Sequence, residues 1–143
     1  MRKILPLLLA LLMLACNRTE HKSVSDPAYS MLERVAELNA GGDKQGALAL
    51  ADSALLMHPA DTTRCWLLSE KAVTLVDMGR MADAVGVAQG AYRLAEKLHD
   101  VDAMLNLRGT MGIAYRRLGK TDSALVQYKE GIQMALAEHN AEY

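Results

Sequence analysis

The feature that most constrains this chain is a glycine followed five residues later by an alanine, three times over. The pairs are Gly42 with Ala47, Gly79 with Ala84, and Gly119 with Ala124. Each alanine is followed, at steps of four and three, by residues that share one helix face: Ala51 and Ala54, Ala88 and Ala91, Tyr128 and Gly131. Since glycine adopts positive φ at low cost, the pattern predicts three helical hairpins, each with its turn at the glycine.

The rest of the chain agrees with a helical protein. Apolar residues make up 51%, with no Phe and one Trp, and the apolar periodicity predicts helices at about 27–40, 44–57, 62–78, 81–98, 101–118 and 122–138. Asp26 with Pro27 predicts the first helix start, and Asp43 the second. Asp61 or Thr62 would cap the third helix, and Thr121 or Asp122 the sixth.

These hairpins resemble the tetratricopeptide repeat. The third hairpin carries Met111, Gly112, Tyr115, Gly119, Ala124, Tyr128 and, in place of the usual alanine, Gly131. The first keeps Gly42, Ala47, Ala51, Ala54 and Pro59, and the second keeps Gly79, Ala84, Ala88 and Ala91. The usual aromatic near each repeat start is replaced by Met31, Leu68 and Arg108, and the glycines are 37 and 40 residues apart.

The resemblance covers about 28–138 and implies a fold class and a kind of function. The expected fold is all-α, a right-handed superhelical stack of three hairpins at about 28–61, 65–98 and 105–138. Family members are protein-binding scaffolds rather than enzymes, so the leading hypothesis is an adaptor without chemistry. A sensory module acting on a partner in trans and an accessory subunit of an envelope enzyme are the alternatives.

Residues 1–15 have the features of an export signal. Arg2 and Lys3 precede an uncharged apolar run of twelve residues, 4–15, which is shorter than the roughly twenty that a membrane-spanning helix needs. The end of the run resembles the lipobox of bacterial lipoproteins, with Ala15 before a lipidated Cys16. An ordinary secretory signal with a chance cysteine is the alternative.

The lipoprotein resemblance implies an anchored chain in a bacterial cell envelope. Residues 16–27 would be the lipidated cysteine and a polar tether, and residues 28–143 the repeat domain. Asn17 is not the Asp that retains some lipoproteins in the inner membrane, which favours the outer membrane, facing the periplasm.

Composition and spacing argue against other classes of function. A net charge of -1 leaves no positive excess for nucleic acid. His58, His99 and His139 recur at intervals of 41 and 40, which places them in separate hairpins, at helix carboxyl ends, rather than around one metal. Cys65 is expected to be a small buried apolar residue. We expect no catalytic residues, cofactor or metal.

By the family's pattern, the first helix of each hairpin lines a concave groove that holds a partner segment. The implied groove residues are Tyr29, Leu32, Ala36, Asn39, Trp66, Ser69, Val73, Val76, Asn106, Gly109, Ile113 and Arg116. Trp66 is either an anchor for the partner or a core residue. The charges with which some members clamp a chaperone's carboxyl terminus are absent, since those positions hold Leu32, Ala36, Glu70, Asn106 and Thr110.

The last helix is expected to leave one face open. Ala124, Tyr128, Gly131 and Ala135 would pack on its own hairpin partner. Leu125, Ile132 and Leu136 would ordinarily receive the next repeat, so they predict a terminal interface for a second copy or a partner protein. The chain end around Tyr143 could instead cover them.

Overall fold

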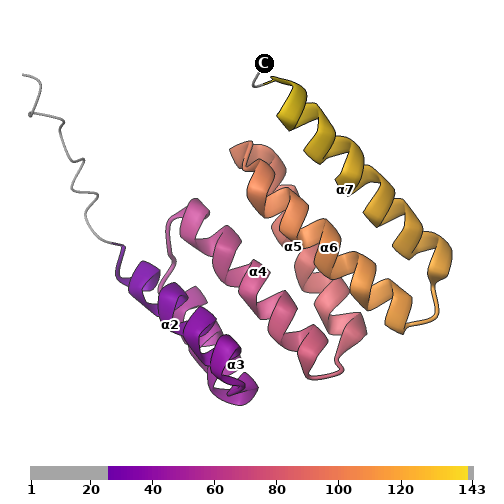
Figure 1. Ribbon diagram of the computed structural model, residues 1–143. Helices are drawn as coiled ribbons and strands as arrows, with labels where there is room; N and C mark the ends of the chain where they lie inside the picture. The colour runs from indigo at the N-terminus through magenta and orange to yellow at the C-terminus, as the bar shows by residue number, and fades with distance from the viewer. Residues whose placement is uncertain (1–25, 142–143) are drawn as a thin grey trace, which may run out of the picture.

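The computed structural model describes residues 26–141, which form three antiparallel helical hairpins side by side in chain order (Figure 1). The helices are α2 (Pro27–Gly41), α3 (Lys44–Leu55), α4 (Asp61–Asp77), α5 (Met81–Leu98), α6 (Val101–Arg117) and α7 (Thr121–Ala141). The sequence-based prediction of an all-α repeat stack is confirmed.

The turn inside each hairpin is made by the predicted glycine. Gly42, Gly79 and Gly119 have φ of 87°, 80° and 73°. In each turn the glycine N–H and the next N–H donate back to carbonyls of the preceding helix, as Gly42 does to Asn39 and Asp43 to Leu38. This arrangement satisfies carbonyls that a helix end leaves unpaired, and it needs a left-handed residue.

His99 makes the same turn between the second and third hairpins without a glycine. Its φ is 54°, and the N–H groups of His99 and Asp100 donate to the carbonyls of Glu96 and Ala95. His58 also has positive φ, 52°. Both follow helix ends, as predicted, while His139 lies in the last turn of α7.

The first helix of each following hairpin packs on both helices of the hairpin before it, since α4 contacts α2 and α3, and α6 contacts α4 and α5. α2 contacts α4, and α4 contacts α6, whereas α3, α5 and α7 do not contact one another. α4 is the centre of the stack, because it touches α2, α3, α5 and α6. α7 touches only α6, so it has a neighbour on one side alone (Figure 1).

Small residues let the helices approach closely. The predicted alanines of α3 and α5 are all fully buried: Ala47, Ala51, Ala54, Ala84, Ala88 and Ala91. Leu67, Leu75 and Leu107 are the largest buried aliphatic side chains, and Cys65 is fully buried in the same cluster as Leu107, as predicted. The core is therefore built from alanine faces and a few larger aliphatic side chains.

Two of the four predicted helix caps are confirmed. Asp26 accepts a hydrogen bond from Ala28 N–H (3.0 Å) at the start of α2, and Asp43 accepts one from Gly46 N–H (2.9 Å) at the start of α3.

The other two caps were wrong. The N-cap of α4 is Ala60, not Asp61 or Thr62, because the start of α4 is fixed from outside: Ala60 N–H donates to the carboxylate of Asp26 (3.0 Å). At α7 the N–H of Ala124 donates to the carbonyl of Lys120, so Thr121 and Asp122 lie in the first turn.

The contact face of α7 also differs in one residue from the prediction. Ala124 is buried, Tyr128 and Gly131 are half-buried, but Ala135 is exposed and Met134 is half-buried instead. The face that packs on α6 therefore continues through Met134 rather than Ala135.

Candidate functional site

The candidate site is the surface formed by the first helices of the three hairpins. Of the residues predicted to line it, α2 contributes Tyr29, Leu32 and Ala36, and α4 contributes Trp66 and Val73. α6 contributes Asn106, Gly109, Ile113 and Arg116. All nine are exposed or half-buried. We call these nine residues the inner surface.

Three other predicted groove residues are buried, so they do not line an accessible surface. Asn39, Ser69 and Val76 have relative exposures of 9%, 1% and 5%. Val76 belongs to an apolar cluster with Leu75 and Ala84. The prediction was wrong for these residues because the first helices pack directly on one another.

The two buried polar residues connect the first helices instead of meeting a ligand. The amide of Asn39 donates to Glu70 (2.9 Å) and accepts from the hydroxyl of Thr74 (2.9 Å), which joins α2 to α4. The hydroxyl of Ser69 donates to the amide oxygen of Asn106 (2.9 Å), which joins α4 to α6. Since buried polar groups cost free energy when unpaired, these bonds fix the order and spacing of the helices.

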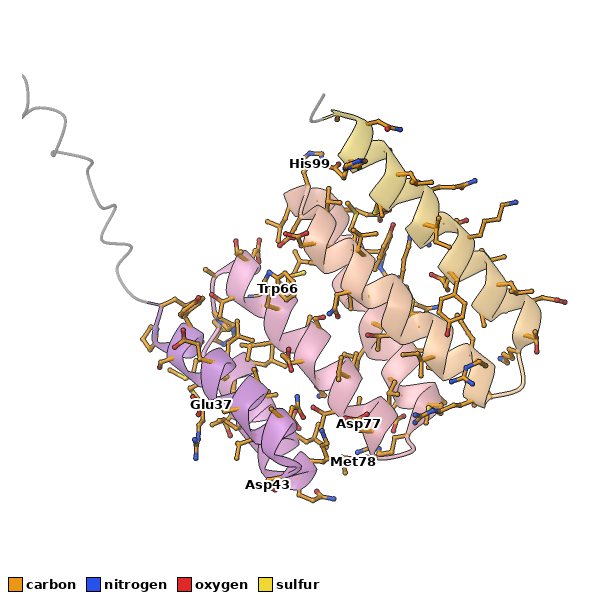
Figure 2. The ribbon with its side chains drawn as sticks, viewed as in Figure 1. Glu37, Asp43, Trp66, Asp77, Met78 and His99 are labelled. Atoms are coloured by element: carbon orange, nitrogen blue, oxygen red, sulfur yellow. The ribbon has the colours of Figure 1, made fainter. Side chains whose placement is uncertain are left out.

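The Trp66 side chain is half-buried, so it is neither a fully buried core residue nor a fully exposed one. Its ring is half-buried against the apolar cluster of Cys65 and Leu107, and its indole N–H donates to Asp100 (3.1 Å). Figure 2 shows Trp66 near the start of α4. The bond holds the indole in one orientation, so the part of the ring that remains accessible has a defined position.

Asp26 and Asp100 act alike, each between the start of another first helix and the start of α4. Asp100 caps α6 through Ala103 N–H (2.9 Å) while it accepts from Trp66 of α4. Asp26 caps α2 and accepts from Ala60 N–H. The hydroxyl of Thr63 bonds to Asp26 and, ahead of the two backbone bonds, lowers the pKa of its carboxyl, against an opposing effect of burial. Each aspartate therefore ties the start of one first helix to α4.

The sequence did not predict these two contacts of Asp26 and Asp100 with α4. An aspartate before a helix is a visible cap, and Asp100 could have been found in that way. Its second partner is 34 residues away in the sequence, and no periodicity reports such a pairing.

On the other face, two clefts contain charged side chains that are already paired. A cleft of about 450 Å³ lies among α3, α4 and α5. Its Lys71 contacts Asp52 at 2.6 Å, and its Arg80 contacts Asp83 at 2.7 Å. With the charges satisfied by each other, this cleft does not present a site for a charged ligand.

The second cleft contains Arg108, which occupies the position of the family's usual aromatic. Its guanidinium lies 4.7 Å from the centre of the Tyr92 ring and donates to the Tyr92 hydroxyl (2.8 Å). It also contacts Glu130 at 2.5 Å and donates to Gln127 at 3.1 Å. Arg108 thus replaces aromatic packing with a stacked, paired cation that holds α7 to α5 and α6.

The predicted terminal residues are exposed on α7. Leu125, Ile132 and Leu136 have relative exposures of 59%, 61% and 57%. Their use as an interface stays a prediction.

Three further properties of residues 26–141 concern metal binding, thiol reactivity and membrane spanning. Residues 26–141 contain no cluster of three or more His, Cys, Asp or Glu side chains suited to a metal ion. Burial, with a further contribution from the charge of Asp100, raises the pKa of the Cys65 thiol to about 11, so the thiolate is rare at neutral pH. Over the same residues, no helix has both the length and the apolar character needed to cross a bilayer.

The comparisons with known proteins agree with this geometry. The sequence pattern of the tetratricopeptide repeat family matches residues 63–137, just over half of the chain. The chain therefore belongs to the tetratricopeptide repeat family, whose repeats generally mediate protein–protein interaction. Neither the curated proteins nor the solved structures gave a match. The hairpin of α2 and α3 lies wholly before the matched range, but it has the same glycine turn and alanine face.

Proposed function

We propose that this protein is a lipid-anchored, non-enzymatic scaffold of the bacterial cell envelope that binds a segment of another envelope protein on its inner surface. The observation that carries the proposal is a row of accessible apolar side chains across three first helices that hydrogen bonds hold in fixed register. Membership of a family of protein-binding repeats supports it.

The inner surface has the composition of a protein-binding site. Tyr29, Trp66 and Arg116 are of the residue types that dominate binding energy at protein interfaces. Leu32, Val73 and Ile113 add apolar area between them. The chemistry favours an apolar or amphipathic segment rather than a charged carboxyl terminus.

The surface is also rigid before the partner arrives. Asn39, Ser69 and their partners fix the spacing of the helices, and Asp100 fixes the indole of Trp66. A surface that is already ordered loses little conformational entropy on binding, so moderate contact area gives useful affinity.

The anchor rests on residues before the described part of the chain. The apolar run 4–15, the Ala15–Cys16 junction and the polar residues up to 25 support lipidation at Cys16 and a tether of about 20 Å. This arrangement would hold the repeat domain close to the membrane where envelope partners are found.

Site-specific photocrosslinking in cells tests the binding surface. A photoreactive amino acid replaces Ala36, which is exposed on α2 within the inner surface. The matched control replaces Ala49, an exposed alanine of α3 outside the inner surface. We expect a discrete adduct with another envelope protein from position 36 that is absent at position 49. Equal adducts at the two positions, or none at position 36, would contradict the proposed surface.

A further inference from the structure

The most exposed large apolar side chain of residues 26–141 lies in the connection between the first two hairpins. Leu56 is 79% exposed, and Met57 beside it is 49% exposed. Both belong to the segment 56–60 that links α3 to α4, which we call the α3–α4 loop. Neither residue is part of the inner surface. Because loops carry much of the binding function of proteins, the place of this pair in the fold decides what it can meet.

The second hairpin does not expose its equivalent residue. The spacing of 37 between the first two turn glycines makes Leu94 the equivalent of Met57, and Leu94 packs against the core. α5 continues to Leu98, whereas α3 ends at Leu55. Pro59 has no N–H to donate to the carbonyl of Leu55, four residues back, so α3 cannot continue as α5 does. The exposed apolar pair is therefore specific to the first connection and is not a general property of the repeat.

A hydrogen bond holds the α3–α4 loop beside Asp26, the first residue that the structure describes. The N–H of Ala60 donates to the carboxylate of Asp26 (3.0 Å). Met57 is three residues before Ala60, so the chain between them spans at most about 11 Å. Figure 1 shows the starts of α2 and α4 at the same end of the stack, with the glycine turns at the other end. The loop therefore lies where the preceding residues join the repeat domain.

We infer that Leu56 and Met57 dock on the lipid surface that holds Cys16, so that this end of the stack rests on the membrane. The inference rests on the lipid anchor of the proposed function. Nine residues, 17–25, separate Cys16 from Asp26, and a polar chain of that length reaches roughly 20 Å. Since the loop stays this close to the lipid, a contact too weak to hold a free protein is formed for much of the time.

The chemistry of the loop fits a lipid surface better than a protein surface. Two apolar side chains offer much less than the roughly 800 Å² per partner that a stable protein interface buries. The charged side chains beside them are already bonded, since Asp61 pairs with Arg64 at 3.3 Å and the carboxylate of Asp26 accepts two backbone N–H groups. His58, the titratable residue of the loop, has an apolar ring body and a polar tip, which suits the headgroup level. Docking on lipid therefore desolvates no isolated carboxylate or guanidinium.

This contact orients the molecule, while the acyl chains attach it. With the α3–α4 loop on the lipid, the turns at Gly42, Gly79 and Gly119 point away from the membrane (Figure 1). The inner surface runs along the first helices between the two ends of the stack, so it stays uncovered and open to a partner.

Fluorescence quenching by brominated lipids tests the contact. Leu56→Trp is compared with Leu118→Trp, which replaces an exposed leucine at the glycine-turn end of α6. Each variant is produced as the full-length chain, purified from membranes and reconstituted in phosphatidylethanolamine and phosphatidylglycerol vesicles with bromine on the acyl chains. Trp66 is present in both variants, so its signal is subtracted with the wild-type protein. Because both variants gain the same ring, the attraction of tryptophan to interfaces is matched.

We expect the added fluorescence of Leu56→Trp to be quenched several-fold more strongly than that of Leu118→Trp. Adding Met57→Glu to Leu56→Trp should weaken the quenching, while circular dichroism keeps the helical signal because Met57 is exposed. Equal quenching in the two variants, or none above the wild type, would overturn the inference. A blue-shifted emission of Leu56→Trp without quenching would also overturn it, because the loop would then be covered by a second copy and not by lipid.

Flotation of the same vesicles separates this inference from the proposed function. Protein that floats with the vesicles but shows no quenching specific to Leu56→Trp overturns the docking alone and leaves the anchor standing. Protein that does not float contradicts the anchor and the docking with it. The photocrosslink at Ala36 reports on the inner surface in either case.

Discussion

At the residue scale, Asp26 and Asp100 each place one carboxylate where two structural elements meet. A helix cap alone needs one oxygen and one backbone N–H. In this protein the second oxygen of each aspartate reaches the start of α4, to Ala60 N–H or to the indole of Trp66. The same side chain therefore stabilises a helix end and the contact between hairpins, and its removal affects both.

The depressed pKa of Asp26 gives a pH-dependent prediction. A carboxylate whose pKa is lower in the folded chain stabilises it above the ordinary pKa, and that contribution is lost as the pH falls through the lowered value. Asp26→Asn can still cap α2 but has only one acceptor oxygen. We expect a lower urea midpoint for Asp26→Asn than for the wild type at pH 7, and a difference that shrinks toward pH 3. A difference that is constant across that range would show that the charge of Asp26 is not responsible.

Cys65 gives a prediction about reactivity. At pH 8 a thiol with a pKa of about 11 is roughly one part in a thousand thiolate, against about a quarter for an ordinary cysteine. In a Cys16→Ser chain we expect maleimide to label Cys65 at least a hundred times more slowly in the folded protein than in urea. An added Leu56→Cys thiol should be labelled within the mixing time, as the exposed control. Rapid labelling of Cys65 in the folded chain would mean that the α4–α5 packing is open.

At the scale of elements, the docking of α7 depends on one glycine. Gly112 of α6 is buried directly beneath the ring of Tyr128 of α7, and a Cβ atom at position 112 would overlap that ring. Gly109, one turn earlier in α6, has open space where its Cβ would be. Packing therefore requires glycine at position 112 but not at position 109. The sequence alone does not distinguish these two positions.

This contrast predicts opposite effects of the same substitution. Gly109→Ala should stabilise the protein by about 0.5–1 kcal/mol, because alanine is the better helix former. Gly112→Ala should destabilise it by about 1–3 kcal/mol, because overpacking against Tyr128 outweighs the same gain. Urea denaturation measures both.

A double variant checks the cause of the Gly112 effect. Gly112→Ala combined with Tyr128→Ala should be less destabilised than the sum of the single variants, since the overlap is then removed. Additive effects would show that Tyr128 is not the residue in conflict with the new methyl group.

Local patterns predicted the elements, but not the contacts between them. Gly42, Gly79 and Gly119 need a left-handed turn, and the alanine faces need a close neighbour. Both requirements are local, so they are readable from spacing. The burial of Asn39 and Ser69 depends on Glu70, Thr74 and Asn106, which lie 31 to 37 residues away. The family's groove positions therefore include residues whose side chains bond helix to helix.

At the scale of the whole molecule, the stack has two unlike ends. The outward face of α2 carries Glu33, Arg34 and Glu37, all exposed, and so needs no cover. The outward face of α7 carries Leu125, Ile132 and Leu136, all exposed. Because the outer faces of a repeat array meet water, the polar face of α2 suits an end of the stack better than the apolar face of α7 does.

The proposed attachment of the molecule to a membrane gives the last prediction. The apolar run of residues 4–15 is too short to span a bilayer as a permanent helix, and the described helices lack a membrane span. Stable attachment would therefore come from acyl chains on Cys16, since two or more chains anchor a protein where one does not.

The wild-type protein should take up radioactive palmitate and stay in the membrane pellet until detergent is added. Cys16→Ser should lose the label and appear as a soluble or unprocessed species, whereas Cys65→Ser, the matched control, should behave as the wild type. A wild-type protein that carries no label and fractionates without membranes would contradict the anchor, yet the inner surface would be unaffected, because it lies wholly within residues 26–141.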